Sequence, residues 1–138
     1  QYRQYYWYHC IEKNMNKMIY GIRSILFLAI LFTSIMSFIA IDTSIAKFLI
    51  QDKLLHFAAF TVISFLAYAS DFKIKRIFLF AALILYGFSI ELIQNTLEYR
   101  TFELYDLLSD IIGVIVGYMS WKYLKKFYPD SWFITISP

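Results

Sequence analysis

Four apolar stretches, each long enough to cross a lipid bilayer, occupy most of this 138-residue chain. A bilayer core about 30 Å thick requires about 20 helical residues. The stretches run over Ser24–Ile41, Leu54–Ser70, Ile77–Leu97 and Leu104–Trp121. Lipid-exposed backbone must satisfy its own hydrogen bonds, and four spans cannot close a barrel. We therefore predict an all-α bundle of four transmembrane helices, in which short loops make neighbouring helices antiparallel.

The remaining segments leave no room for a separate soluble domain, since hydrophobic residues make up 60% of the chain. We expect the transmembrane domain over residues 19–126 and a C-terminal tail over 127–138. Residues 1–18 are expected either not to be native, with the natural start at Met15 or Met18, or to form an interfacial aromatic anchor. The longest internal loop, Ile41–Lys53, is mildly amphipathic and is expected to lie along the outer surface of the membrane.

Basic residues alternate between the two sides of the predicted bundle. Ten lysines and arginines lie in the N-terminal segment, the loop after the second span and the tail, whereas the other two loops hold only Lys47, Lys53 and Arg100. The positive-inside rule then places both termini in the cytoplasm. Such basic clusters indicate topology signals and contacts with anionic lipids rather than nucleic-acid binding. The single cysteine, Cys10, excludes an intrachain disulfide and a multi-cysteine metal site.

Ionisable residues inside the spans gather toward the predicted outer face. His56 begins the second span four residues after Asp52, Glu91 and Gln94 lie near the end of the third, and Asp106 and Asp110 begin the fourth. Helical rise puts the deepest of them about 10 Å below the surface. Such side chains are costly in a membrane, so they are read by default as functional or as paired in the bundle interior. We predict that they share one layer with Lys53 and Arg100.

Each of these residues also has a structural reading. His56 fits an interfacial histidine or one satisfied by a neighbour. Glu91 fits a carboxylate that pairs with Arg100 or Lys53 or that stays protonated. Asp106 fits a residue that caps or stabilises the start of its helix. A functional layer could carry out acid–base chemistry through His56 or Glu91, bind a divalent cation, or bind an anionic group through Arg100 and Lys53. The residue spacing does not choose among these chemistries.

Gly113 and Gly117 form a small-residue pair on the same helix face as Asp106 and Asp110. Small residues at this spacing let another helix approach closely. We therefore expect Asp110 to face a helix rather than lipid. The glycine face is also the expected docking surface for a second copy or another membrane protein.

The ordered set of these residues resembles the VanZ-like family. It comprises Asp52-Lys53-x-x-His56-Phe57, Glu91-x-x-Gln94, Arg100, and Asp106-x-x-x-Asp110-x-x-Gly113 followed by Gly117. Many relatives have Asn where this chain has Asp110. The resemblance implies a small multi-spanning membrane protein, from a family whose founding member is linked to low-level teicoplanin resistance, and it supplies no mechanism.

From these observations we predict a cell-envelope protein that binds an anionic envelope ligand or lipid in an outer-leaflet pocket. Its predicted ligand-binding residues are Asp52, Lys53, His56, Glu91, Gln94, Arg100, Asp106 and Asp110. The alternative is a non-catalytic membrane subunit or assembly factor whose polar layer is a structural ion-pair network. A proton-coupled transporter is the third hypothesis. Four short spans without broken helices do not favour it unless the chain dimerises.

Overall fold

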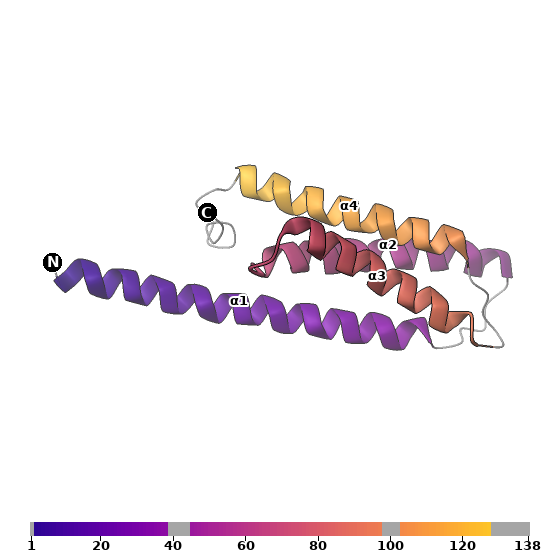
Figure 1. Ribbon diagram of the computed structural model, residues 1–138, viewed down its shortest axis with the longest axis horizontal. Coiled ribbons are helices and arrows are strands. Elements are labelled where there is room, and N and C mark those ends of the chain that lie inside the picture. Colours follow the sequence, from indigo (N-terminus) through magenta and orange to yellow (C-terminus); the bar gives the residue numbers. More distant parts are fainter. Residues whose placement is uncertain (1, 39–44, 98–102, 128–138) are drawn as a thin grey trace.

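The computed structural model confirms the all-α architecture (Figure 1). The structure describes the backbone of residues 2–38, 45–97 and 103–127, and the side chains of 16–38, 52–97 and 103–127. Within these parts the helices are α1 (Tyr2–Ser37), α2 (Ile45–Ala69), α3 (Arg76–Gln94) and α4 (Leu104–Phe127). Each contains a segment long and apolar enough to cross a membrane: Asn16–Ser37, Asp52–Ala69, Arg76–Gln94 and Leu104–Phe127. The chain is therefore a multi-pass membrane protein.

Consecutive helices run in opposite directions, as the short loops predicted (Figure 1). The end of α1, the start of α2, the end of α3 and the start of α4 consequently lie at the same end of the bundle. The start of α1 and the end of α4 lie at the other. Which of these two ends faces the cytoplasm stays a prediction from the distribution of basic residues.

The start of α2 differs from the expectation. We predicted a surface loop over Ile41–Lys53, but α2 already begins at Ile45. Residues 45–53 contain neither glycine nor proline, and good helix formers such as Ala46 and Leu49 allow the helix to continue outward beyond the apolar span. Asp52 and Lys53 therefore sit on a regular helix, which fixes their spacing to His56.

The closest helix contact joins α2 and α4. A Cβ added at Gly113 would lie 2.6 Å from the Phe57 carbonyl oxygen, and one added at Gly117 would collide with the Thr61 carbonyl oxygen. The two backbones thus touch at both glycines. Across this contact the Ser64 hydroxyl donates a hydrogen bond to the Val114 carbonyl at 2.8 Å. This arrangement is how membrane helices associate closely without a hydrophobic driving force.

The outer surface of the bundle is apolar, as expected for a protein solvated by lipid. On α1, Phe27, Leu28 and Phe32 are 66%, 61% and 65% exposed. Phe60 of α2 and Val114 of α4 are fully buried and form the centre of the described core. Of the four candidate spans, that of α1 is the least buried, so α1 lies against the other helices with only one narrow face.

Candidate functional site

A buried hydrogen-bonded pair connects α2 to α4 near the start of α4. His56 Nδ1 lies 3.0 Å from Asp110 Oδ1, and the two side chains are 7% and 0% exposed. Within the described part of the chain, Asp110 Oδ2 is buried and has no hydrogen-bond partner. It faces Gly87 of α3, where an added Cβ would lie 2.7 Å from this oxygen. Asp110 therefore faces neighbouring helices and not lipid, as its position beside Gly113 predicted.

Lys53 lies between two carboxylates, those of Asp106 in α4 and of Glu103, the residue directly before α4. Its Nζ donates a hydrogen bond to Glu103 Oε2 at 2.6 Å and forms an ion pair with Asp106 Oδ1 at 3.1 Å. Lys53 and Glu103 are both about one-third exposed, whereas the Asp106 side chain is only 4% exposed. Asp106 lies in the first turn of α4, where the helix dipole also favours a negative charge. The structural reading of Asp106 is thus compatible with its position.

Glu91 is fully buried at the level of these pairs. Its Oε2 accepts a hydrogen bond from the Glu103 backbone N–H at 3.3 Å. Its Oε1 is buried without a hydrogen-bond partner among the described residues. The expected ion pair with Lys53 does not form, because Lys53 is engaged by Glu103 and Asp106. We call Asp52, Lys53, His56, Glu91, Glu103, Asp106 and Asp110 the polar layer.

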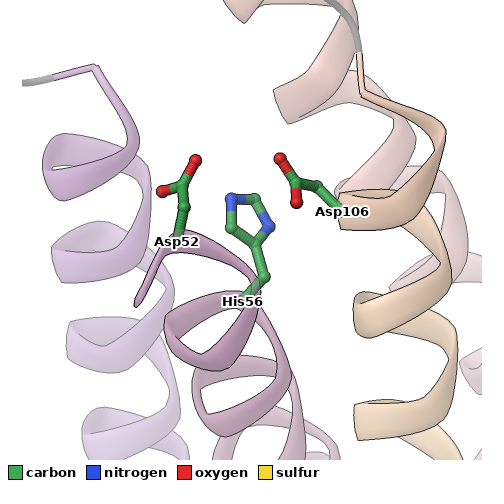
Figure 2. A group of neighbouring side chains, drawn as sticks. All are labelled: Asp52, His56 and Asp106. Carbon is green, nitrogen blue, oxygen red and sulfur yellow. The ribbon is translucent and has the colours of Figure 1, made fainter. Parts of the chain in front are cut away.

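Asp52, His56 and Asp106 form a tighter group within the polar layer. One ligand atom from each residue lies within 4.8 Å of the others. Figure 2 shows the carboxylates of Asp52 and Asp106 pointing toward the His56 ring from opposite sides. Asp52 and His56 come from one face of α2 and Asp106 from α4, so the α2–α4 contact creates this group.

Two predicted site residues lie elsewhere or cannot be placed. Gln94 is buried, and its side-chain amide donates a hydrogen bond to the Ser37 backbone carbonyl at 2.9 Å. It therefore connects α3 to the end of α1, and a ligand-binding role for it stays a prediction. Arg100 lies outside the described residues.

A cavity of about 180 Å³ opens between α1 and α2 beside the polar layer. Its polar lining comes from Asp52 and His56 of α2, together with Thr33 and Ser37 of α1. Its apolar lining is Phe32, Met36, Leu55 and Ala59. The cavity can therefore accept a molecule that has an apolar part and a polar end.

Sequence reasoning missed the contribution of α1 and that of Gly87. Thr33, Met36 and their neighbours look like ordinary residues of an apolar span, and no pattern in α1 marks them as cavity residues. Gly87 had a usable signal, because it precedes Glu91 by four residues and so shares its helix face. Glycine on the polar face of an apolar helix indicates a close approach at that level.

The face carrying Gly113 and Gly117 is occupied by α2 of the same chain. The predicted close helix contact at these glycines is therefore made within the molecule. Docking of a second copy or another membrane protein on this face stays a prediction, and it would require α2 to move aside.

A model of the VanZ/LLP1 family matches residues 4–125 of this chain. The match includes three of the four candidate spans in full, all but the last two residues of the fourth, and every residue of the polar layer. It also begins inside segment 1–18, whose origin stays a prediction. No curated protein and no solved structure matches the chain. Because the family model covers well over half of the sequence, the chain belongs to the VanZ/LLP1 family.

Proposed function

We propose that this protein binds a lipid or lipid-linked ligand of the cell envelope. The apolar part of the ligand lies in the cavity between α1 and α2, and its polar head meets Asp52 and His56. The observation that carries this proposal is the mixed lining of the cavity, which joins the apolar outer surface of the bundle to the polar layer. The predicted topology places this cavity in the extracytoplasmic leaflet of the cytoplasmic membrane.

The charge of the polar head depends on which cations face the cavity. We expected Lys53 and Arg100 to receive an anion. Lys53, however, already faces two carboxylates, and it does not line the cavity. A preference for an anionic head therefore depends on Arg100, or on another cation beside Asp52 and His56.

Phenylalanine substitutions at two neighbouring alanines test whether the cavity binds lipid. Ala59 lines the cavity, whereas its neighbour Ala58 is exposed on α2 and does not line it. Ala59→Phe would fill the cavity, and Ala58→Phe would add the same group to the lipid-facing surface. The full chain is reconstituted in phosphatidylcholine vesicles containing a trace of photoactivatable phosphatidylglycerol or photoactivatable phosphatidylcholine, and crosslinks to α1 and α2 are mapped by mass spectrometry.

We expect Ala59→Phe to abolish most crosslinking to Phe32, Met36 and Leu55, and Ala58→Phe to leave it unchanged. Equal crosslinking in both variants would mean that the cavity is not a lipid site. If the phosphatidylglycerol probe crosslinks no better than the phosphatidylcholine probe, the protein binds lipid without a preference for anionic heads. In that case the anionic part of the proposal is wrong.

The alternative function, a non-catalytic subunit or assembly factor with a structural polar layer, is favoured by the interhelical pairs. Lys53 joins α2 to Glu103 and Asp106, and His56 joins α2 to Asp110. Two oxygens, Glu91 Oε1 and Asp110 Oδ2, nevertheless lack partners among the described residues, so the network is not saturated.

Glu91→Gln distinguishes the two functions, because the amide oxygen can still accept the hydrogen bond from the Glu103 N–H. On the structural reading it leaves folding unchanged or slightly improved and has no other effect. A folded Glu91→Gln protein that loses lipid crosslinking supports the ligand site instead.

A further inference from the structure

The polar layer holds more negative than positive charge. Its acidic members are Asp52, Glu91, Glu103, Asp106 and Asp110, and its basic members are Lys53 and His56. Glu91, Asp106 and Asp110 are each at most 3% exposed. Buried carboxylates that outnumber their cations are expensive in a membrane. The charges of the described residues are therefore balanced only by protons, by a bound cation or by Arg100, which lies outside the described residues.

His56 is already arranged as a metal ligand would be. His56 Nδ1 lies 3.0 Å from Asp110 Oδ1. In the neutral tautomer protonated at Nδ1, the ring would donate that proton to Asp110, and the Nε2 lone pair would be available to a metal ion. Metal-binding histidines characteristically donate their second ring N–H to a carboxylate in this way, which fixes the tautomer and the ring orientation. Asp110 would then act as a positioning residue and not as a ligand.

The two flanking carboxylates supply oxygen ligands. Asp106 is more than nine-tenths buried and is aimed at the His56 ring (Figure 2). Its Oδ1 faces Lys53 at 3.1 Å but makes no aligned hydrogen bond. Asp52 approaches the ring from the opposite side, and all three ligand atoms lie within 4.8 Å of one another. Small side-chain movements would bring them to the bond lengths of about 2.0–2.2 Å that such an ion requires.

An ion could reach this group from the cavity, since Asp52 and His56 also line it. The cavity leaves space for water or a ligand oxygen to complete the coordination. A site of one imidazole and two carboxylates combines a nitrogen ligand suited to Zn²⁺ or Fe²⁺ with oxygen ligands suited to Mn²⁺.

We propose that Asp52, His56 and Asp106 bind one divalent transition-metal ion beside the α1–α2 cavity, with Asp110 holding the histidine in the binding tautomer. Such an ion would offset the excess negative charge of the polar layer. It would also provide the cation that an anionic lipid head needs. The metal site itself does not depend on lipid binding, because it can be measured without an added ligand.

The test uses the full chain purified in detergent, stripped with a chelator and titrated with Mn²⁺ alone. Bound Mn²⁺ is quantified by electron paramagnetic resonance, and pulsed measurements on the same sample detect an imidazole nitrogen bound to the ion. We expect one Mn²⁺ per chain with a nitrogen signal, and competition by Zn²⁺. The absence of binding at millimolar Mn²⁺ and millimolar Zn²⁺, or binding without a nitrogen signal, would overturn the proposal.

Variants then separate specific ligation from simple attraction to negative charge. Asp52→Asn and His56→Gln should each weaken Mn²⁺ binding by more than about tenfold, and Asp110→Asn by about 10–100-fold. Glu103→Gln is the matched control, because it removes one negative charge from the polar layer at a residue that is not a proposed ligand and is linked to Asp106 only through the shared Lys53. Its effect should stay below about threefold, since Glu103 is partly exposed.

Equal weakening in Glu103→Gln and Asp52→Asn would show nonspecific attraction and would also overturn the proposal. If His56→Gln fails to fold, the nitrogen signal of the unmodified protein decides the question without it. Failure of lipid crosslinking together with intact Mn²⁺ binding would remove the proposed function while leaving the metal site in place.

Discussion

The two ends of the bundle handle charge in different ways. We call Arg23, Asp71, Lys73, Arg76 and Trp121 the basic end. There, Arg23 donates hydrogen bonds to the backbone carbonyls of Ser70 and Asp71 at 3.1 and 3.3 Å. The Arg76 guanidinium lies 5.2 Å from the centre of the Trp121 ring. Its two arginines thus contact neutral carbonyls and aromatic rings. In the polar layer, charges face other charges. Among the described residues, Glu91 Oε1 and Asp110 Oδ2 have neither a hydrogen-bond partner nor an ion-pair partner.

This difference separates anchoring from a candidate site. Arginines that extend over aromatic rings to the membrane interface keep their guanidinium groups in contact with water, carbonyls and rings, and so need no ligand. Buried carboxylates have no such solution, because lipid offers them neither water nor counter-ions. On the proposals above, an external cation or ligand lowers the free energy of the folded protein by binding at the polar layer. At the basic end, the described arginines already contact carbonyls and aromatic rings.

The largest expected effect on stability comes from removing one partner of the most buried pair in the polar layer, His56 and Asp110. His56→Leu leaves Asp110 buried without its hydrogen-bond partner, and we expect a loss of about 3–5 kcal/mol in the free energy of unfolding. The double variant His56→Leu/Asp110→Leu should recover most of this loss, because no buried polar group is then left alone. Reversible unfolding of the full chain in mixed micelles measures both.

The matched change at the basic end is Arg76→Leu, which removes an exposed cation above Trp121. Its expected cost is below about 1 kcal/mol. Similar losses in His56→Leu and Arg76→Leu would erase the contrast between the two ends.

The next largest effect concerns the α2–α4 contact at Gly117, which lies between the polar layer and the basic end. Gly117→Ala forces a methyl group against the Thr61 carbonyl oxygen and the Ser64 Cβ, so we expect a loss of about 1–3 kcal/mol. Gly21→Ala is the control, because an added Cβ there meets nothing within 4 Å. That variant should be neutral or gain up to about 1 kcal/mol from helix propensity. The same unfolding measurement applies, and a neutral Gly117→Ala would contradict the packing.

The sequence predicts the helices far better than it predicts their partners. Continuous apolar stretches are enough to locate four spans, and the four-residue spacing of Asp106 and Asp110 is enough to give them one face. The same periodicity does not predict that Lys53 pairs with Glu103 and Asp106 and not with Glu91, because this pairing depends on the rotation of α2 relative to α4.

The α1 side of the cavity is unpredictable for a related reason. Thr33 and Ser37 can satisfy their hydroxyls within their own helix, as Ser37 does by donating to the Thr33 carbonyl at 2.7 Å. Their presence in an apolar span therefore carries no sign of a neighbouring cavity. Only the placement of α1 against α2 reveals that these residues lie beside Asp52 and His56.

A smaller effect is expected where Arg23 closes the end of α2. Arg23→Met removes both hydrogen bonds to the Ser70 and Asp71 carbonyls that follow α2. We expect a loss of about 1 kcal/mol in the free energy of unfolding, because the site is partly exposed and water can replace the donor. Since the acceptors are neutral, the loss measured by micelle unfolding should not depend on salt. A strong salt dependence would mean that Arg23 pairs with a charge instead.

The smallest expected effect is that of Lys73→Ala. Together with Lys53→Ala, it compares two lysine–carboxylate pairs of similar length. Lys73 Nζ lies 2.8 Å from Asp71 Oδ2, but its side chain is 75% exposed, whereas Lys53 is 29% exposed and faces two carboxylates. An exposed pair contributes less than about 0.5 kcal/mol and is screened in about 1 M salt. Lys53→Ala removes the cation from the buried Asp106 and should cost more, with a loss that salt reduces only in part. Unfolding both variants in low and high salt measures the difference, and an equal response would mean that the polar layer is as open to water as the basic end.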